Sequence, residues 1–353
     1  MRTWSCFAVA MILAACGSLF ALQDAFGQSR TVAIGYIPTP NPWLYPAGDG
    51  TFERETGYKI NWVRLDTSNQ VIQALHEGRV QIGYSDSVPI AIGMSGGVDM
   101  ELFWIASLVE YSEALIGRNL SKVTDPQSLR GKKIATPFWS SCHYQTIFAL
   151  EQFDIPANKV ELYNMSPDEI VANWRRGTID AACVSYPALE RLLPDARIMA
   201  WAGWIGRWGR PTFRGFVANR KWSAANPEFM AKFVEIIEAT NGNYRANPAR
   251  WTSTSPEVRS IVAMVGHQAN IPPQLAALTL LESFEQQSPR GLGGGKTGMA
   301  AKSLQDSAKI LENFGMIKKA LDDYSAFVTP KWAEAAVAEQ EKRTRVAPER
   351  VRK

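Results

Sequence analysis

Two stretches of this chain share one pattern, and that repeat limits the folds it can adopt. VIQALHEGRVQIG at 71–83 and IVANWRRGTIDAA at 170–182 each read as an amphipathic helix, a glycine stop and a strand, with their glycines 99 residues apart. A polar turn and a helix led by proline follow each copy. Helices that alternate with short apolar strands are typical of parallel sheets. The repeat therefore predicts an α/β protein with two similar lobes, each a mainly parallel sheet flanked by helices.

The positions of the expected strands divide the chain between these lobes. We place lobe I at 31–112 plus 218–340, lobe II at 113–217, and a basic tail at 341–353. Ligands of open α/β sheets sit beyond the carboxyl ends of the strands. The loops expected at those ends should therefore face one another across a hinged cleft; they are 37–46, 66–70, 84–88, 137–143 and 184–187.

The segment GKKIATPFWSSCHY at 131–144 has the pattern of a strand followed by a helix start. Pro137 ends the apolar strand, and Ser140 and Ser141 precede an apolar helical run. A serine here caps the helix, because its hydroxyl accepts a hydrogen bond from a free amide of the first turn. The remaining amides and the helix dipole favour an anion at the same place. Both interpretations, a plain cap and an anion site, stay open.

Composition excludes several classes of protein. The 353 residues are 46% hydrophobic and 20% charged, which is enough for two domains with their own cores. The net charge of +4 comes partly from the final residues, and no basic stripe interleaved with aromatics indicates a nucleic-acid partner. Three histidines at no ligand spacing predict no metal, and we expect no other cofactor. Whether Cys142 and Cys183 pair is open, since two cysteines make no disulfide framework.

The first 30 residues have the pattern of an export signal. Arg2 precedes a mostly apolar run from Trp4 to Leu22, and Ala25-Phe26-Gly27 is a cleavage site that would remove residues 1–27. Leu13-Ala14-Ala15-Cys16-Gly17 instead resembles a lipobox, which would be cleaved before Cys16. No later segment has about 18 uninterrupted apolar residues. We expect a periplasmic protein, either soluble or lipid-anchored through Cys16.

Several motifs along the chain resemble one family. From about Val32 to Val328 the chain is similar to the taurine-binding proteins of bacterial sulfonate importers, within the wider taurine, nitrate and thiamine-precursor class of periplasmic binding proteins. The resemblance implies a type II, two-lobed hinged fold and a monomer that delivers its ligand to an inner-membrane permease powered by a separate ATPase. The motifs that carry it are LDT (65–67), VQIGYSDSVP (80–89), YSEAL (111–115), GKKIATPFWSSCHY, RRGTIDAACVSYPA (175–188), RWGRPT (207–212) and DYSAFVT (323–329).

The resemblance assigns roles to four residues. Ser140, Ser141 and His143 match the family loop that holds the anionic sulfonate. Glu113 matches the acid of the family's SEAL motif and is a candidate partner for a ligand ammonium. Charged contacts contribute roughly 1.5–3 kcal/mol each, whereas micromolar binding needs about 8 kcal/mol. Groups from both lobes must therefore converge on the ligand.

The chain departs from that family at two loops. The turn Ser85-Asp86-Ser87 stands where the family is small and uncharged, and Arg214 stands where taurine-binding proteins carry an aspartate. Arg214 can face the ligand, since its planar fork suits a sulfonate or carboxylate. Alternatively it pairs with Asp86 or Glu113 and bridges the lobes. Asp86 can also simply cap the helix that Pro89 begins.

Aromatic residues can supply apolar walls to the expected cleft. Trp43, Tyr111, Trp139 and Tyr186 all lie near strand ends. Trp43 and Trp139 are the strongest candidates, because both sit in loops where packing into a core is less frequent than in helices and strands.

Three hypotheses for function follow. The first is a non-catalytic periplasmic receptor for a small sulfonate, taurine or a close analogue. The second keeps the transport role but changes the ligand to an organic dianion or an aromatic acid. The third is an enzyme of the thiamine-precursor type. Because Cys142 and His143 are adjacent on a helix, their side chains diverge and form no obvious dyad, which disfavours the enzyme.

Overall fold

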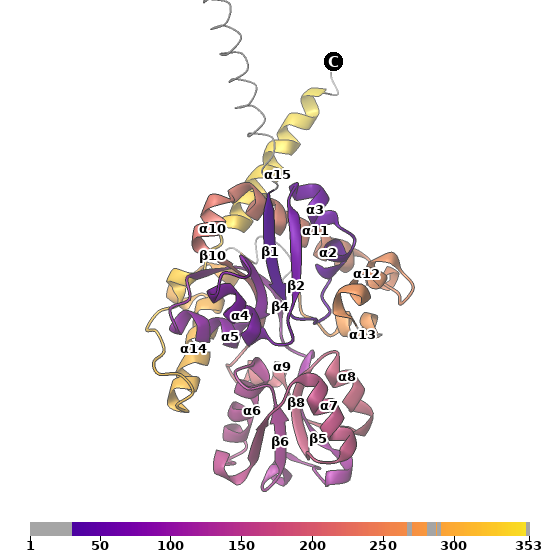
Figure 1. Cartoon of the computed structure of the whole chain (residues 1–353), viewed down its shortest axis with the longest axis vertical. Coiled ribbons are helices and arrows are strands. Elements are labelled where there is room, and N and C mark those ends of the chain that lie inside the picture. Colours follow the sequence, from indigo (N-terminus) through magenta and orange to yellow (C-terminus); the bar gives the residue numbers. More distant parts are fainter. Residues whose placement is uncertain (1–29, 267–269, 281–286, 288–290, 351–353) are drawn as a thin grey trace, which may run out of the picture.

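The chain folds into two α/β lobes joined by a pair of crossing segments (Figure 1). The computed structural model describes residues 30–266, 270–280, 287 and 291–350, so the expected export signal lies outside the described residues. Within these ranges, two five-stranded sheets form, one in each lobe. The predicted fold class is confirmed.

The sheet of lobe I is built from five strands: β1 (Thr31–Tyr36), β2 (Lys59–Arg64), β3 (Ile82–Asp86), β4 (Met100–Leu108) and β10 (Phe213–Asn219). Their order across the sheet is β2-β1-β3-β10-β4. β1 pairs in parallel with β2 and β3, whereas β10 runs antiparallel between β3 and β4. The β3–β10 register sets Arg214 directly opposite Asp86.

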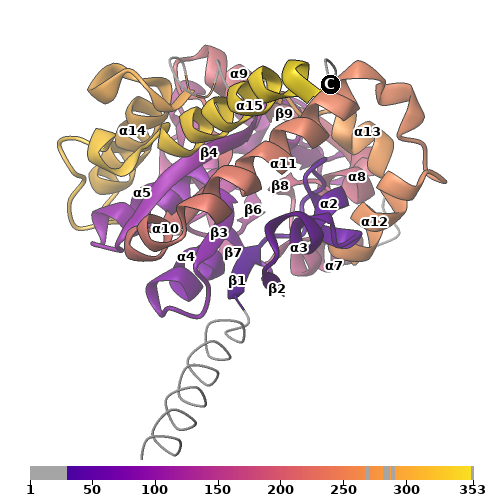
Figure 2. The ribbon, with the colours of Figure 1, turned by 90° about the horizontal axis from the view of Figure 1, so that it is seen from above.

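Helices cover both faces of this sheet. Figure 2 shows α15 and α11 lying along one another on one side, and α4, α5 and α14 toward the other edge. Each face buries its own apolar cluster. The helices of lobe I are α2 (Leu44–Gly48), α3 (Thr51–Thr56), α4 (Ser68–His76), α5 (Ser87–Ser95), α10 (Arg220–Ala225), α11 (Pro227–Ala246), α12 (Pro256–Val265), α13 (Ile271–Ala276), α14 (Met299–Asn313) and α15 (Lys331–Arg350).

Lobe II repeats this plan on a continuous stretch of chain. Its strands are β5 (Glu113–Arg118), β6 (Lys133–Thr136), β7 (Glu161–Asn164), β8 (Ala181–Ser185) and β9 (Ala196–Trp201), in the order β7-β6-β8-β5-β9. Its helices are α6 (Ser141–Gln152), α7 (Pro167–Arg176), α8 (Ala188–Leu192) and α9 (Ala202–Arg207). The repeated sequence pattern thus corresponds to α4–β3 in lobe I and α7–β8 in lobe II.

Each sheet contains one strand that opposes the other four, namely β10 in lobe I and β5 in lobe II. These two strands are the first elements formed after each crossing between the lobes. The lobe boundary expected at 217 falls inside β10, because Phe213 already pairs with Leu108 of lobe I. The return crossing therefore precedes residue 213.

Apolar packing also joins the lobes along one side. Val88 of α5 and Leu311 of α14, both in lobe I, belong to the same buried cluster as Tyr144 and Phe148 of α6 in lobe II. Figure 1 shows α14 and α5 above α6 on this side. Burial of shared apolar surface stabilises this edge of the interface.

The C-terminal part of the described chain is helical. The basic residues expected as a separate tail continue α15 as far as Arg350. Among the described helices, none combines the length and hydrophobicity needed to cross a bilayer.

Trp43 lies in the core of lobe I. It is fully buried, and its ring meets those of Tyr84 and Phe216 edge-on, each with centroids 5.0 Å apart. Aromatic rings in this arrangement add to the stabilisation from area burial. The structure thus gives Trp43 a packing role, although its proline-rich loop had made it a candidate for the ligand cleft.

We predict that Trp43→Ala lowers the free energy of unfolding by about 3–5 kcal/mol, because it removes a large side chain from a packed core. Urea denaturation measures the change. Trp208→Ala is the matched control, since Trp208 is 42% exposed, and should cost about 0.5 kcal/mol or less. Equal losses in the two variants would contradict the core assignment.

Candidate functional site

A cavity of about 200 Å³ lies between the lobes, where strand-end loops of both sheets meet. Lobe I contributes Thr39, Ser68 and Asp86, and lobe II contributes Glu113 and Ser140. Further lining residues come from the loop after β7, from the end of β8 and from the segment that follows it through α8; they include Ser166, Ser185, Tyr186 and Arg191. The expectation that these loops face one another is met by this geometry.

Three helices begin at this cavity. Thr67 caps α4, Ser140 caps α6 and Ser166 caps α7, each accepting a hydrogen bond from an amide of the first turn. All three capping residues border the cavity. Helix N-termini carry partial positive charge and free amides, so together they favour an anion at this place.

Ser140, Ser141 and His143 have different surroundings in the structure. Ser140 borders the cavity, and its hydroxyl accepts from the His143 amide at 3.2 Å. Ser141 is buried, and its Oγ has no hydrogen-bond partner among the described residues. Neither Ser141 nor His143 is a lining residue of the cavity. Their expected contact with an anion stays a prediction.

The His143 ring supports the loop that precedes α6. It stacks on Phe138 with centroids 4.2 Å apart, and its Nδ1 accepts from the Trp139 amide at 3.2 Å. Burial lowers the pKa of His143 to about 4, so the ring is neutral at pH 7. Trp139 has a φ of 65°, which is unusual for a bulky residue. The contacts of His143 therefore hold a strained loop and place no positive charge at the cavity.

The other aromatic candidates have different surroundings. Tyr186 borders the cavity. Tyr111 is 44% exposed and packs edge-on against Trp201. Trp43 and Trp139 are not lining residues. Of the expected apolar walls, only Tyr186 lies where a ligand in this cavity would touch it.

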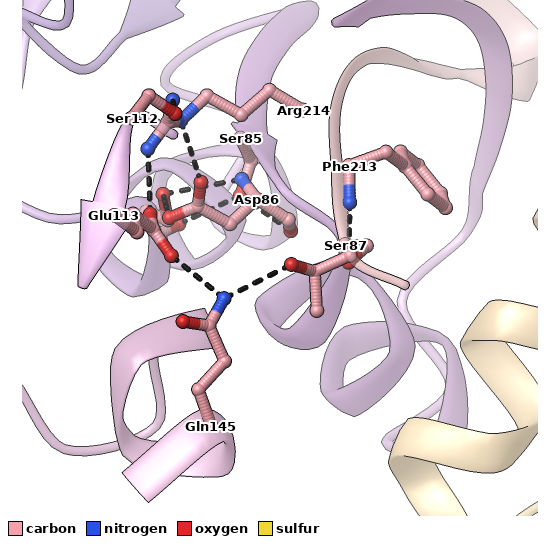
Figure 3. Close-up of polar contacts among 10 residues, drawn as sticks. Ser85, Asp86, Ser87, Ser112, Glu113, Gln145, Phe213 and Arg214 are labelled. Atoms are coloured by element: carbon pink, nitrogen blue, oxygen red, sulfur yellow. Dashed lines mark hydrogen bonds and ion pairs between the residues drawn. The ribbon is translucent and has the colours of Figure 1, made fainter. Parts of the chain in front are cut away.

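A buried guanidinium joins two carboxylates from opposite lobes (Figure 3). Arg214 Nε donates to Asp86 Oδ1 at 2.9 Å, and Arg214 Nη2 donates to Glu113 Oε1 at 2.6 Å. Nη1 donates to Ser112 Oγ at 3.2 Å. Arg214 is fully buried and does not border the cavity, whereas both carboxylates do. Of the two roles open for Arg214, the structure supports ion pairing with both acids.

Further donors fix the remaining carboxylate oxygens. Ser68 Oγ donates to Asp86 Oδ2 at 2.7 Å, and Gln145 Nε2 donates to Glu113 Oε2 at 2.9 Å. Asp86 stands at the N-cap position of α5 but makes no side-chain cap bond there. The role of Asp86 as a helix cap is therefore wrong, because Arg214 and Ser68 hold its oxygens. Ser85, also a candidate, is buried and donates to the Ser68 carbonyl at 3.3 Å instead.

This network changes the pKa of Glu113. Burial raises the pKa of Glu113 to about 7, because its carboxylate loses hydration; Arg214 lowers this pKa and Asp86 raises it. Burial lowers the pKa of Arg214, but the two carboxylates raise it above its usual value. With both acids ionised, the network of one guanidinium and two carboxylates carries one net negative charge.

Several residues here were missed by sequence reasoning. Three of them hydrogen-bond to the charged residues of the network, which lie far away in the sequence, so no local pattern marks them; they are Ser68, Ser112 and Gln145. Arg64 and Arg191 border the cavity, and Arg191 pairs with Asp168 at 3.0 Å. The sequence made Asp86 one possible partner of Arg214, and the strand register shows that the two residues are directly opposed.

This chain is similar to known proteins over most of its length. The sequence profile of the NMT1/THI5-like family matches residues 44–250, more than half of the chain. The chain is 30% identical to the taurine-binding periplasmic protein of Escherichia coli (strain K12) over 308 residues, covering 87% of this chain and 94% of that protein. This chain belongs to the NMT1/THI5-like family.

Solved structures of other proteins have the same fold as this NMT1/THI5-like protein. The alkanesulfonate-binding protein SsuA from Xanthomonas axonopodis pv. citri, bound to MOPS, has a TM-score of 0.70 at 18% identity and covers 86% of this chain and 98% of its own. The desulfurization enzyme DSZB has a TM-score of 0.60 at 14% identity and covers 88% of this chain and 99% of its own. The fold alone therefore does not distinguish binding from catalysis.

The two cysteines that this NMT1/THI5-like protein has among the described residues, Cys142 and Cys183, are free and buried. Burial raises the pKa of the Cys142 thiol, and the adjacent Cys183 thiol raises it further. A thiol with a raised pKa is a poor nucleophile at pH 7. Within the described ranges, no three His, Cys, Asp or Glu side chains group closely enough to hold a metal ion.

We predict that Arg214→Met destabilises the protein by about 3–5 kcal/mol, because it leaves two buried carboxylates without their counter-charge. Urea unfolding at pH 8 measures this loss. At pH 5.5 the loss should be smaller, since Glu113 has a raised pKa and is protonated there. The triple variant Arg214→Met, Asp86→Asn, Glu113→Gln removes all three charges and should recover most of the loss. A triple variant as unstable as the single one would show that Arg214 acts by packing.

Proposed function

We propose that this protein is the substrate-binding component of an ABC importer, which captures a small sulfonate such as taurine in the periplasm and delivers it to an inner-membrane permease. One observation carries the proposal. The interlobe cavity has helix N-termini capped by Ser140, Thr67 and Ser166 for an anion, and the carboxylates of Asp86 and Glu113 for a cation. Taurine carries both charges at opposite ends. The 30% identity to a taurine-binding periplasmic protein supports the same ligand class.

The charges around the cavity argue against a dianionic ligand. Arg214 was the residue that suggested one, but it is fully buried and bound to two acids. An anionic group placed against Asp86 and Glu113 would meet like charge at a few ångströms, which costs a few kcal/mol at an intermediate dielectric. Because the cavity is bordered by these two acids as well as by Arg64 and the three helix N-termini, its charges favour a ligand that carries both signs, which is a zwitterion.

The same cavity gives little support for an enzyme. Cys142 borders the cavity and carries a thiol, which could act as a nucleophile. Burial raises the pKa of this thiol. The neighbouring His143 ring accepts a hydrogen bond from the Trp139 amide and does not border the cavity. A nucleophile needs a base within hydrogen-bond reach. We infer a binding role without turnover.

We predict that taurine raises the melting temperature of the purified protein. A ligand that binds only the folded state at 100 times its Kd stabilises that state by about 2.7 kcal/mol, which corresponds to a shift of roughly 5 °C. Differential scanning fluorimetry with taurine and with ethane-1,2-disulfonate measures it. Taurine should give the larger shift. No shift with any sulfonate, or conversion of taurine to a product, would contradict the proposed function.

We predict that taurine affinity falls with pH below about 7. Glu113 has a raised pKa, so it gains a proton as the pH falls through that value and no longer attracts an ammonium. Linkage to one proton reduces affinity by up to about tenfold per pH unit below the pKa. Calorimetry between pH 5.5 and 8 measures the slope, with Glu113→Gln as the control that should flatten it. Equal taurine affinity at pH 5.5 and pH 8 in the unaltered protein would contradict this role of Glu113.

A further inference from the structure

Only part of the buried charge network borders the cavity. Asp86 and Glu113 border it with 7% and 2% of their surface exposed, whereas Arg214 lies behind them with none. A ligand in the cavity therefore meets two carboxylates directly, and the guanidinium only through them. Figure 3 shows Arg214 on one side of the two acids and Gln145 on the other.

The hydrogen bonds of the network leave room for a donor. Each of the four carboxylate oxygens accepts one hydrogen bond from a side chain, that of Arg214, Ser68 or Gln145. An ionised carboxylate has about four acceptor positions, so roughly two remain on each acid. A primary ammonium presents three N–H donors, which matches acceptors that arrive from two lobes.

The charge of the network is also incomplete. One guanidinium cannot neutralise two carboxylates, and buried charges are costly unless they are paired. A ligand with one positive charge completes the balance, whereas a neutral group leaves it unchanged and an anion worsens it. The raised pKa of Glu113 fits this account, since protonation relieves the same excess when no cation is present.

We propose that Asp86 is a specificity-determining residue, which makes this cavity select ligands whose second end is a hydrogen-bearing ammonium, with Arg214 as the positioning residue that holds Asp86 and Glu113 together across the lobes. The inference rests on the proposed function, because it assumes that the ligand's first end is a sulfonate. It adds the class of the other end and the residue that sets it.

The strand register explains why Asp86 has this effect. Asp86 and Arg214 are directly opposed on β3 and β10, so their charges cancel locally and Glu113 supplies the net negative charge. When Asp86 is neutral, Arg214 and Glu113 cancel instead, and the buried network no longer attracts a cation through its net charge. The side chain at position 86 thus decides whether the buried network is negative or neutral.

The test compares three sulfonates that differ only at the second end: taurine, isethionate with a hydroxyl, and ethane-1,2-disulfonate. In calorimetry at pH 8, the unaltered protein should bind taurine at least tenfold more tightly than isethionate. Asp86→Asn should lose at least tenfold for taurine, change less than threefold for isethionate, and gain for the disulfonate. Asp99→Asn is the matched control; Asp99 precedes β4 at the far end of the sheet and pairs with Arg220 at the surface.

A second measurement needs no variant and so does not depend on whether Asp86→Asn folds. N,N,N-trimethyltaurine keeps the positive charge but has no N–H donor, and the unaltered protein should bind it at least tenfold more weakly than taurine. Equal binding of taurine and isethionate, or equal losses for both in Asp86→Asn, would overturn the inference while leaving a sulfonate receptor. Failure of every sulfonate to bind would instead overturn the proposed function.

Discussion

The ion pairs of Arg214 with Asp86 and Glu113 are the contact on which the arrangement of the two lobes depends. They join β10 and β3 of lobe I to the first residue of β5 in lobe II through a fully buried guanidinium. Buried ion pairs often stabilise a protein no more than apolar residues of similar volume would. Their effect is on the relative positions of the two acids, because a guanidinium fork donates hydrogen bonds to carboxylates only in set directions. The cavity therefore has two acids at a fixed spacing.

The repeat in the sequence relates the residues of this contact to each other, because they occupy matching positions in the two lobes. Asp86 ends β3, and Ser185 ends β8 at the same place in the second copy. Arg214 lies opposite Asp86, and Glu113 lies opposite Ser185, so Arg214 and Glu113 occupy equivalent places in the two lobes. These two equivalent positions thus carry opposite charges and form an ion pair where the lobes meet.

Local patterns predicted much of the fold and little of the site. The capping box of Ser166, the helix stop at Gly177 and the strand Phe213–Asn219 all depend on neighbouring residues, and the structure has each of them. Trp43 was misjudged, because a proline-rich loop does not reveal that long-range packing buries it. The partners of Arg214 could be proposed but not chosen, since burial and register arise only once β3 and β10 pair.

The position of β10 has a consequence for how the chain folds as it is made. All five strands of lobe II lie between residues 113 and 201, so its sheet can be completed from one continuous segment. In lobe I, the strand that pairs with β4 among the described strands is β10, which begins at Phe213. A ribosome delivers the chain from its N-terminus, and domains fold as units once their parts are available. The lobe that begins first can therefore complete its sheet only after all the strands of lobe II have been synthesised.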